Sequence, residues 1–281
     1  MKRAIRRVSN KLTKTRVLRG NKSLRRRILA TRRMDRDALY AMLQKYTMVY
    51  IKPCNGSQGK GVIRVERIPE SGGNDSQDSI DVIDRKKRIK YRYQTGVRVH
   101  QFTNYRKTYR AILKETRGRP YLVQKGVRLL VHAGRPFDVR VMVQRNPKGR
   151  WKATGIVGRV AHPRKVVTNG SQGGTIYPVE VLLKVYTGKE KRKALMSKMK
   201  KIGVKAARQL SAAYPGMREI GADIALDRRL KPWIIEVNTN PDPCPFTKLK
   251  NRSMIRRIIR YAKGYGRTYK LRCTKSKQGV V

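Results

Sequence analysis

One stretch of this chain limits its possible folds more than any other: residues 48–61, MVYIKPCNGSQGKG. The apolar residues 48–51 predict a buried strand, and Pro53 ends its pairing. Three glycines follow, and a glycine loop lets successive backbone N–H groups turn toward one anion because no Cβ blocks the approach. Residues 62–68, VIRVERI, alternate apolar and charged side chains, which predicts a second strand. The sequence therefore predicts a hairpin whose tip either folds over phosphates or is an ordinary glycine-rich turn.

The glycine loop does not match the P-loop of nucleoside triphosphatases. That motif has four residues between its first glycine and Gly-Lys, and then Ser or Thr at the start of a helix. Here Gly56 is too close to Lys60, Gly61 takes the Ser/Thr position, and a strand follows. Lysines at the mouth still supply charge for phosphate. A phosphate-binding hairpin of another type is the hypothesis that the loop supports.

The composition predicts a globular protein with two or three lobes. The chain has 281 residues, enough to bury a full core, and 39% of them are hydrophobic. No apolar run reaches the roughly 18 residues of a membrane span, and no apolar stretch follows the basic N-terminus as in a secretory signal. The chain has three cysteines: Cys54, Cys244 and Cys273. They lack metal-site spacing, and three thiols cannot all pair in disulfides. This cysteine usage is typical of a protein in a reducing cytoplasm.

The charge balance is extreme: 70 Lys and Arg stand against 17 Asp and Glu, a formal net charge of +53. Such a molecule repels itself unless anions surround it. Nucleic acid, an anionic polymer and an anionic substrate are the possible partners. There is no aromatic-interleaved RNA signature and no zinc-finger spacing, so we expect any nucleic-acid binding to be non-specific. A solvated basic surface without a specific partner is the alternative.

Apolar periodicity and turn residues predict the remaining elements. We expect Asn10 to cap a first helix and Asp35 to cap a second. The predicted helices span 11–18, 36–46, 97–115, 190–213 and 252–263. Beyond the hairpin, the predicted strands span 80–84, 89–94, 121–124, 127–132, 137–145, 151–161, 219–226 and 232–238.

Two acidic residues lie inside apolar strands, Asp223 in IGADIAL and Glu236 in WIIEVN. A charge there is costly unless it is paired or bound to metal. Glu236 and Asn238 are two apart on one strand and therefore face the same way, and the hairpin can place Asp223 beside them. Three oxygen ligands suit Mg²⁺, which shares its coordination shell with phosphates. A buried salt bridge with arginine is the alternative.

Two arginines belong to neighbouring predicted strands. Arg140 shares one face of PFDVRVMV with Asp138, and Arg159 lies in GRVA. Arginines that converge on a cleft floor can bind phosphate and stabilise charge while a phosphoryl group moves. Taken singly, such residues are more often surface charges.

In this order, the motifs resemble the ATP-grasp superfamily. IKPCNGSQGKG and EVNTNPDP carry the resemblance, with FDVR, RVA, TN..GG and GAD between them, over roughly residues 8–245. The chain looks closest to the YheC/YheD group associated with Bacillus-type spore coats, and its last third is similar to RimK-like glutamate ligases. The resemblance implies an α+β ATP-grasp fold in which two α+β lobes grip ATP between antiparallel sheets.

The resemblance also implies a role for each matching residue. Lys52 matches a lysine on the α- and β-phosphates, and Lys11 matches the other ATP lysine. The flap over the triphosphate matches Gly56, Ser57, Gln58, Gly59, Lys60 and Gly61. Adenine would be held by Gln124, Lys125 and Val127, and Asn169 would line the same cleft. The arginines that bind phosphate or the intermediate match Arg140 and Arg159, and the magnesium ligands match Asp223, Glu236 and Asn238.

The expected organisation is a basic helical lead-in at 1–46, a small lobe with the flap at 47–124, a large lobe with the metal site at 125–265, and a basic tail at 266–281. ATP-grasp enzymes usually carry a full α/β domain before the first lysine, and here only about ten residues precede it. That domain normally helps to bind the carboxylate substrate. We therefore expect the pre-ATP-grasp domain to be largely missing.

The implied activity is an ATP- and Mg²⁺-dependent carboxylate–amine ligase that works through an acylphosphate on an acidic peptide or protein. One alternative is a kinase of an anionic small molecule. Another is a structural protein that binds polyanions and keeps the fold without turnover. The expected location is the cytoplasm, with the spore coat implied by the family.

Overall fold

The computed structural model describes residues 7–56, 59–69, 89–163, 173–271, 273–274 and 276–279. The chain forms two compact units. Unit 1 contains Met1–Ala30, Cys54–Lys60 and Val127–Val281, and unit 2 contains Thr31–Pro53 and Gly61–Gly126. This division differs from the four segments expected from the sequence, because residues 1–30 and Cys54–Lys60, which is nearly all of the glycine loop, belong with the last part of the chain.

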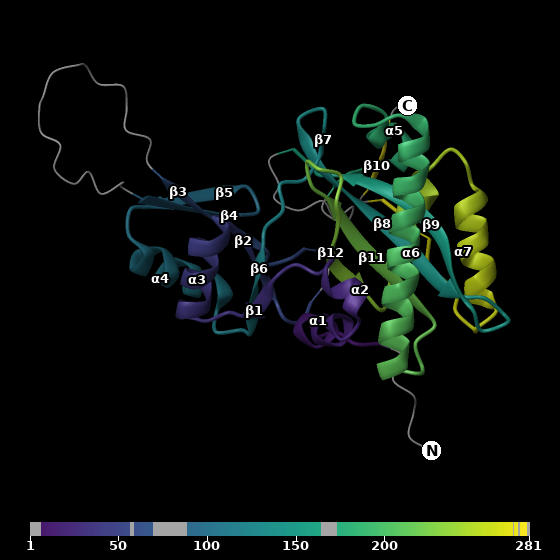
Figure 1. The fold of residues 1–281 in the computed structure, drawn as a ribbon, viewed down its shortest axis with the longest axis horizontal. Coiled ribbons are helices and arrows are strands. Elements are labelled where there is room, and N and C mark those ends of the chain that lie inside the picture. Colours follow the sequence, from purple (N-terminus) through teal and green to yellow (C-terminus); the bar gives the residue numbers. More distant parts are fainter. Residues whose placement is uncertain are drawn as a thin grey trace, which may run out of the picture. The chain divides into compact units, whose positions relative to one another are not determined.

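Unit 2 is built on a six-stranded antiparallel sheet with the strand order β1-β6-β2-β3-β4-β5 (Figure 1). Its strands are β1 (Thr31–Arg33), β2 (Met48–Pro53), β3 (Ile63–Pro69), β4 (Ile89–Thr95), β5 (Arg98–Phe102) and β6 (Tyr121–Lys125). Its helices are α3 (Arg36–Tyr46) and α4 (Tyr105–Thr116). Alternate strand residues such as Val49, Ile51 and Val65 are buried, as period-2 patterning predicts.

The predicted hairpin around the glycine loop is confirmed. β2 and β3 pair antiparallel from Met48 opposite Glu66 to Ile51 opposite Ile63. Gly61, just before β3, has a φ of +71°, and a Cβ there would lie 2.8 Å from the Tyr121 hydroxyl. This position therefore requires glycine for both its backbone conformation and its lack of space.

The helix predicted over 97–115 is wrong in its first part. Gly96, with a φ of +59°, lets β4 turn back into β5, which pairs with β4 from Arg98 opposite Thr95 to Phe102 opposite Tyr91. The helix α4 then starts after Asn104, whose side chain accepts a hydrogen bond from the Lys107 backbone N–H at 3.2 Å. Pairing with β4 overrides the helical spacing of the apolar residues. The strand predicted at 80–84 lies outside the described residues.

Unit 1 contains a sheet with the order β12-β11-β8-β9-β10-β13, in which β7 also pairs with β8. Its strands are β7 (Val131–His132), β8 (Arg135–Arg145), β9 (Trp151–Val160), β10 (Thr175–Tyr177), β11 (Glu219–Leu226), β12 (Pro232–Asn238) and β13 (Lys277–Gln278). Its helices are α1 (Lys11–Arg19), α2 (Lys22–Arg25), α5 (Val179–Lys184), α6 (Lys189–Ala213) and α7 (Ser253–Lys263), with a 3₁₀ turn, η2, at Cys244–Lys248.

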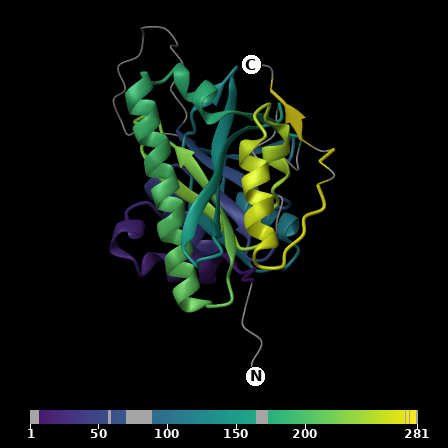
Figure 2. The same ribbon diagram turned by 90° about the vertical axis from the view of Figure 1, so that its right-hand side faces the viewer.

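The two faces of the unit 1 sheet are covered by different helices (Figure 2). On one face, α6 packs against the side chains of Val141 and Val143, close to Gly203. On the other face, α7 and η2 pack against Met142 and Val157. Because side chains alternate along β8, the polar residues Asp138 and Arg140 share the second face with Met142. This alternation places the candidate site on that face.

Two contacts join the described part of the basic C-terminal tail to the rest of unit 1. β13 pairs in parallel with β10, and Cys273 is disulfide-bonded to Cys244 at the start of η2. Cys54 is buried and does not take part in this disulfide. The strand predicted at 127–132 is reduced to the two residues of β7, because residues 127–130 form no strand. Among the described residues, no helix has both the length and the apolar character needed to cross a membrane.

Candidate functional site

Strand register brings the predicted charged residues of unit 1 together. Glu236 on β12 lies opposite Asp223 on β11, and Asp223 lies opposite Arg140 on β8. Asp138, two residues before Arg140, lies opposite Arg159 on β9. Carboxylates and guanidinium groups therefore form a row across four strands on one face of the sheet. The sequence predicts Asp223 beside Glu236 and predicts Arg140 on the face of Asp138, and strand register joins these two groups.

Arg159 is the most buried cation of this row. Its Nε donates to Asp138 Oδ1 at 2.7 Å and its Nη2 to Asp138 Oδ2 at 2.6 Å, and both residues are 2% exposed. The same Nη2 lies 3.1 Å from Asp223 Oδ2. Burial by itself would lower the pKa of Arg159, but the carboxylates of Asp138 and Asp223 raise it above its usual value. This guanidinium is a fixed positive charge.

Asp223 is held by both arginines. Arg140 contacts it through Nε and Oδ1, and Arg140 Nη2 donates to Oδ2 at 3.1 Å. Asn238 Nδ2 also donates to Oδ2, at 3.3 Å. Burial would raise the pKa of Asp223, but the two guanidinium groups lower it below its ordinary value. The sequence left two hypotheses for this buried acid, a metal ligand and a salt bridge with arginine. In the structure Asp223 forms salt bridges with Arg140 and Arg159.

A glycine makes room for the Arg140 side chain. A Cβ at Gly221, two residues before Asp223, would lie 3.2 Å from Arg140 Cδ and 2.9 Å from the Pro241 Cβ. A side chain there would require Pro241 or the Arg140 side chain to shift. The GAD motif therefore fixes Arg140 through its glycine as well as through its aspartate.

Lys11 connects the glycine loop to the strand that carries Glu236. It is the first residue of α1, which Asn10 caps by accepting a hydrogen bond from the Thr13 N–H at 3.1 Å. Its backbone N–H donates to the Cys54 carbonyl at 2.8 Å, and its Nζ donates to the Gly56 carbonyl at 2.8 Å. The same Nζ lies 3.6 Å from Glu236 Oε1.

Sequence reasoning missed Lys14, which is 5% exposed. Burial lowers its pKa, while the carboxylates of Glu236 and Asp223 act in the opposite direction. The signal was present in the sequence, because residues three apart on a helix share a face, and Lys14 follows Lys11 by three. A second lysine of α1 therefore belongs to this charged group.

The predicted metal ligands fit magnesium in chemical type. Glu236 and Asn238 face one way on β12, with Asp223 opposite Glu236, and carboxylate and amide oxygens are the ligands that Mg²⁺ prefers. The contacts differ among the three, because Asp223 is paired with two arginines whereas Glu236 has a lysine at 3.6 Å. Within the described part of the chain, no three His, Cys, Asp or Glu side chains are grouped to hold a metal.

Unit 2 carries the other predicted nucleotide-binding residues. Lys52 Nζ donates to Gln124 Oε1 at 2.6 Å, with Lys52 7% and Gln124 5% exposed. Gln124 Nε2 in turn donates to Thr31 Oγ1 at 3.2 Å. The Lys125 ammonium lies 5.0 Å from the centre of the Tyr46 ring. The predicted phosphate lysine and the first predicted adenine residue are therefore direct neighbours.

The other predicted residues fall into two groups, those in the described part of the chain and those outside it. Gly59 and Lys60 form a turn, with Gly59 at a φ of +71°, and Val127 begins the last segment of unit 1. Ser57, Gln58 and Asn169 lie outside the described residues. The roles of all predicted site residues stay predictions.

Comparison with known proteins identifies the family. A family model described as YheC/D like ATP-grasp matches residues 4–267. The chain is 28% identical over 197 residues to the endospore coat-associated protein YheD of Bacillus subtilis (strain 168), covering 70% of this chain and 40% of YheD. It is 22% identical over 207 residues to YheC of the same organism, covering 73% of this chain and 52% of YheC. The chain thus spans about half the length of these relatives, or less.

A solved structure supports the fold. The biotin carboxylase domain of 2-oxoglutarate carboxylase from Hydrogenobacter thermophilus, determined with MgADP, ADP and bicarbonate, matches with a TM-score of 0.52 and 14% identity. The match covers 96% of this chain and 48% of that one. This likeness confirms the ATP-grasp fold expected from the sequence.

Proposed function

Because this chain belongs to the YheC/D-like ATP-grasp family, we propose that it binds ATP with magnesium and uses it to join a carboxylate to an amine. One observation carries the proposal: Lys11 contacts both the carbonyl of Gly56 and the carboxylate of Glu236. Lys11 thereby joins two parts of the proposed site. One is the glycine segment at Gly56, which suits phosphate, and the other is the Glu236 carboxylate, which suits magnesium.

The charges of unit 1 suit a triphosphate. Lys11 and Lys14 on α1, with Arg140 and Arg159 on the sheet, provide four cations. Three carboxylates, those of Asp138, Asp223 and Glu236, lie on the same row, so the group keeps an excess of positive charge. Arginine and lysine bind phosphate oxygens through charge-assisted hydrogen bonds. In unit 2, we propose Lys52 as a phosphate-binding residue.

Glu236 and Asn238, with Asp223 beside them, would hold the magnesium ion. When bound, magnesium offsets phosphate charge and fixes the orientation of phosphate oxygens. Arg140 and Arg159 are already held in position by buried carboxylates, so their positive charges need little rearrangement during reaction. No side-chain nucleophile is required, because the substrate carboxylate attacks the γ-phosphorus.

The proposed reaction has two steps. A carboxylate oxygen of the acceptor bonds to the γ-phosphorus of ATP while the bond to the β-bridging oxygen breaks, giving an acylphosphate and ADP. The amine nitrogen then attacks the carbonyl carbon, phosphate leaves, and the nitrogen loses a proton. The protein contributes positioning and charge stabilisation to both steps.

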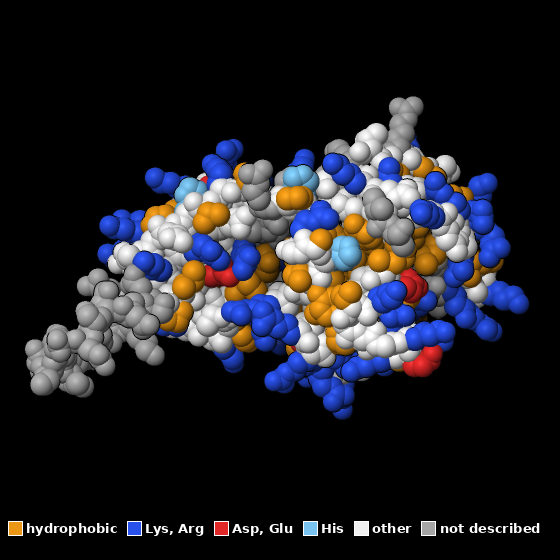
Figure 3. All heavy atoms as spheres, turned by 90° about the horizontal axis from the view of Figure 1, so that it is seen from above, with side chains coloured by type: hydrophobic (Ala, Val, Ile, Leu, Met, Phe, Trp, Pro, Cys, Tyr) orange, Lys and Arg blue, Asp and Glu red, His pale blue; other side chains and the backbone are white. Residues whose placement is uncertain are grey.

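The acceptor that we propose is an acidic peptide or protein. The support is the net charge of +53, and in Figure 3 Lys and Arg side chains are spread over the face of the molecule shown, with few Asp and Glu between them. A positive surface raises the local concentration of an anionic substrate. Since two relatives are named endospore coat-associated proteins, we propose a location in the cytoplasm or at the spore coat.

Two other functions rest on specific observations. The same cations also suit a kinase of an anionic small molecule, because phosphoryl transfer needs the same positioning of ATP. The pairing of Asp223 with both arginines favours a non-catalytic polyanion-binding protein. Of the two carboxylates proposed as magnesium ligands, only Glu236, with Lys11 at 3.6 Å, then lacks a close ion pair.

The test is incubation with Mg²⁺, ATP and an acidic peptide library plus amines, with ADP release and new amide bonds measured by mass spectrometry. Hydroxylamine trapping of an acylphosphate separates a ligase from a kinase. Glu236→Gln should abolish ADP release, whereas the matched variant Glu180→Gln, an exposed acid on α5, should retain it. ADP release without hydroxamate would indicate a kinase, and no ADP release with any acceptor would contradict the ligase proposal.

A further inference from the structure

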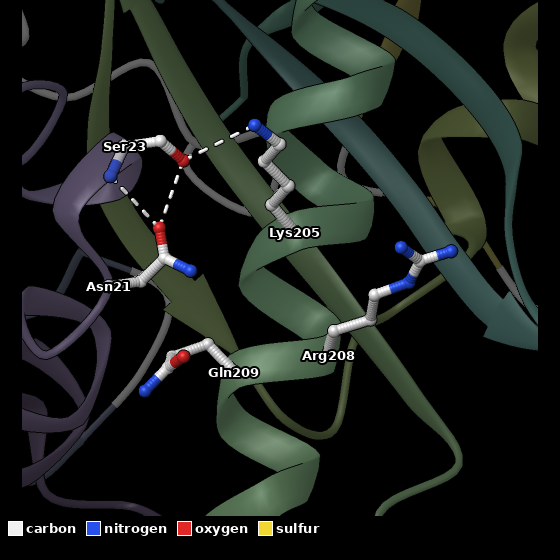
Figure 4. Close-up of a pocket in the computed structure, with 5 residues that line it drawn as sticks. All are labelled: Asn21, Ser23, Lys205, Arg208 and Gln209. Carbon is white, nitrogen blue, oxygen red and sulfur yellow. Dashed lines mark hydrogen bonds between the residues drawn. The ribbon is translucent and has the colours of Figure 1, made fainter.

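A cavity of about 310 Å³ opens in unit 1 between the start of α2 and the C-terminal half of α6 (Figure 4). Its lining residues are Asn21, Ser23, Lys205, Arg208 and Gln209. It is separate from the row of carboxylates and arginines described above, with which it shares no residue. All of the lining side chains are polar, and two of the five are cationic.

Two of these side chains are oriented into the cavity by existing hydrogen bonds. Asn21 Oδ1 accepts from the Ser23 N–H at 3.0 Å, the Ser23 hydroxyl at 2.9 Å and the Leu24 N–H at 3.1 Å. These bonds fix the amide so that its NH₂ group is directed toward α6 (Figure 4). Lys205 Nζ donates to Ser23 Oγ at 3.3 Å. An ammonium group has three donors, so two remain for a ligand.

The charge of the cavity has no acidic counterpart among the described lining residues. None of the described acidic residues lines the cavity. Most of the described acidic residues of unit 1 have partners elsewhere. Five form ion pairs with an arginine or a lysine: Asp138, Glu190, Glu219, Asp223 and Glu236. Two accept hydrogen bonds from other side-chain or backbone donors: Asp227 and Asp242. The cavity therefore presents donors and positive charge with little opposing charge, which suits an anion.

A line of cations leads to the cavity along α6. Lys198, Lys201, Lys205 and Arg208 are spaced by three or four residues, so they lie on one side of the helix, and all four are exposed. With a rise of 1.5 Å per residue, the line is about 15 Å long. Arg208 belongs to both the cavity lining and this line, and in Figure 4 its side chain points away from Asn21.

We infer that this cavity binds a phosphate ester, and that the line of cations on α6 accommodates further phosphates when the ester belongs to a nucleic-acid strand. A phosphate ester presents oxygens in several directions, which matches the Asn21 amide NH₂ group and the Lys205 ammonium on two sides of a hollow, whereas the two carboxylate oxygens lie in one plane. At about 30 Å³ per water, the cavity has room for roughly ten waters, so a sugar fits with its phosphate. None of the described lining residues is aromatic, so these residues would not read the base by stacking.

The first measurement follows the side-chain amide signals of Asn21 and Gln209 by NMR in the full chain. Ribose 5-phosphate should shift these signals in the wild-type protein and not in Lys205→Gln, while acetate at equal ionic strength should leave them in place. Unshifted amide signals with ribose 5-phosphate, or equal shifts with acetate, would overturn the proposal. ATP should bind Lys205→Gln as it binds the wild type, so this result is independent of the function proposed above.

The second measurement distinguishes a strand from a free phosphate ester. A labelled mixed-sequence single-stranded 12-mer is titrated at about 0.15 M salt into the wild type, Lys205→Gln and Lys191→Gln. Lys191 is an exposed lysine of the same helix, about 21 Å from Lys205 along its axis. We expect Lys205→Gln to bind the strand at least fivefold more weakly and with a salt slope smaller by about 1, while Lys191→Gln stays within twofold. Equal losses in the two variants would show an indifferent basic surface and overturn the strand assignment.

Discussion

Arg159 and Asp138 form a buried, two-bonded ion pair between β9 and β8, with donor–acceptor distances of 2.7 and 2.6 Å. Because the same guanidinium also contacts Asp223, two arginines and two aspartates compensate one another below the surface. Such a group stabilises the fold only while it is complete, since removing one partner leaves a buried charge unpaired.

We therefore predict that Asp138→Asn lowers the free energy of unfolding by about 3 kcal/mol. Urea unfolding followed by the fluorescence of Trp151 and Trp233, which both lie in unit 1, measures the change. Glu190→Gln is the control, because Glu190 and Lys193 form an exposed pair, at 80% and 63% side-chain exposure, of a kind worth below about 1 kcal/mol. Equal midpoints for the two variants would contradict the structural role of Asp138.

A second prediction concerns acid stability of unit 2. Burial would raise the pKa of Glu66, but its contacts with Arg92 and Arg64 lower it below its ordinary value. The folded state therefore binds a proton at Glu66 less readily than the unfolded state does. The resulting stabilisation is complete above the unfolded-state pKa and is lost as the pH falls toward the folded-state pKa.

Glu66→Gln should consequently flatten the decline in stability of unit 2 between about pH 5 and pH 2. Because both tryptophans lie in unit 1, the measurement is hydrogen exchange of the β3 and β4 amides across that range. A decline as steep in Glu66→Gln as in the wild type would show that Arg64 and Arg92 do not stabilise the ionised acid.

A third prediction separates two glycines of unit 2 that both have positive φ. Gly61 and Gly96 have φ values of +71° and +59°, so alanine is strained at each. A Cβ at Gly61 would also lie 2.8 Å from the Tyr121 hydroxyl, whereas nothing lies within 4 Å of one at Gly96. Gly61→Ala should therefore lose at least about 1 kcal/mol more stability than Gly96→Ala. Equal losses in thermal or urea unfolding would show that Tyr121 yields without cost.

Much of the fold was predictable because local patterns agree with tertiary packing. The strands predicted at 219–226 and 232–238 and the helix at 36–46 match β11, β12 and α3 to the residue. Apolar periodicity and the Asp35 cap identify the helix, and the DRRLKP turn separates the two strands. The same alternation correctly places Glu236 and Asn238 on one face beside Asp223.

Other features depend on contacts that are distant in sequence. The residues of β5 could not be separated from α4, because their strand character comes from pairing with β4. The bond between Cys244 and Cys273 and the pairing of β13 with β10 join the tail to residues that no local pattern connects. The partners of Asp223 could not be predicted either, because the sequence contains many arginines. Only the strand register places Arg140 and Arg159 next to Asp223.

The last prediction tests the connection made by Lys11. Its ammonium contacts the Gly56 carbonyl at 2.8 Å and lies 3.6 Å from Glu236, so it holds the glycine segment beside the proposed magnesium ligand. Lys11→Met keeps the aliphatic part of the side chain and removes both contacts. We expect ATP affinity to fall at least tenfold, about 1.4 kcal/mol, and the amides of residues 54–56 to exchange faster. Calorimetry with magnesium and hydrogen exchange without ATP measure the two effects.

The control is Arg16→Met, which removes one charge from the exposed side of the same helix and should change neither ATP affinity nor amide exchange. If Lys11→Met and Arg16→Met bind ATP equally well, Lys11 is a structural contact of the loop rather than a phosphate ligand. If Lys11→Met loses ATP affinity but its amides exchange no faster, Lys11 acts on ATP directly and does not order the loop.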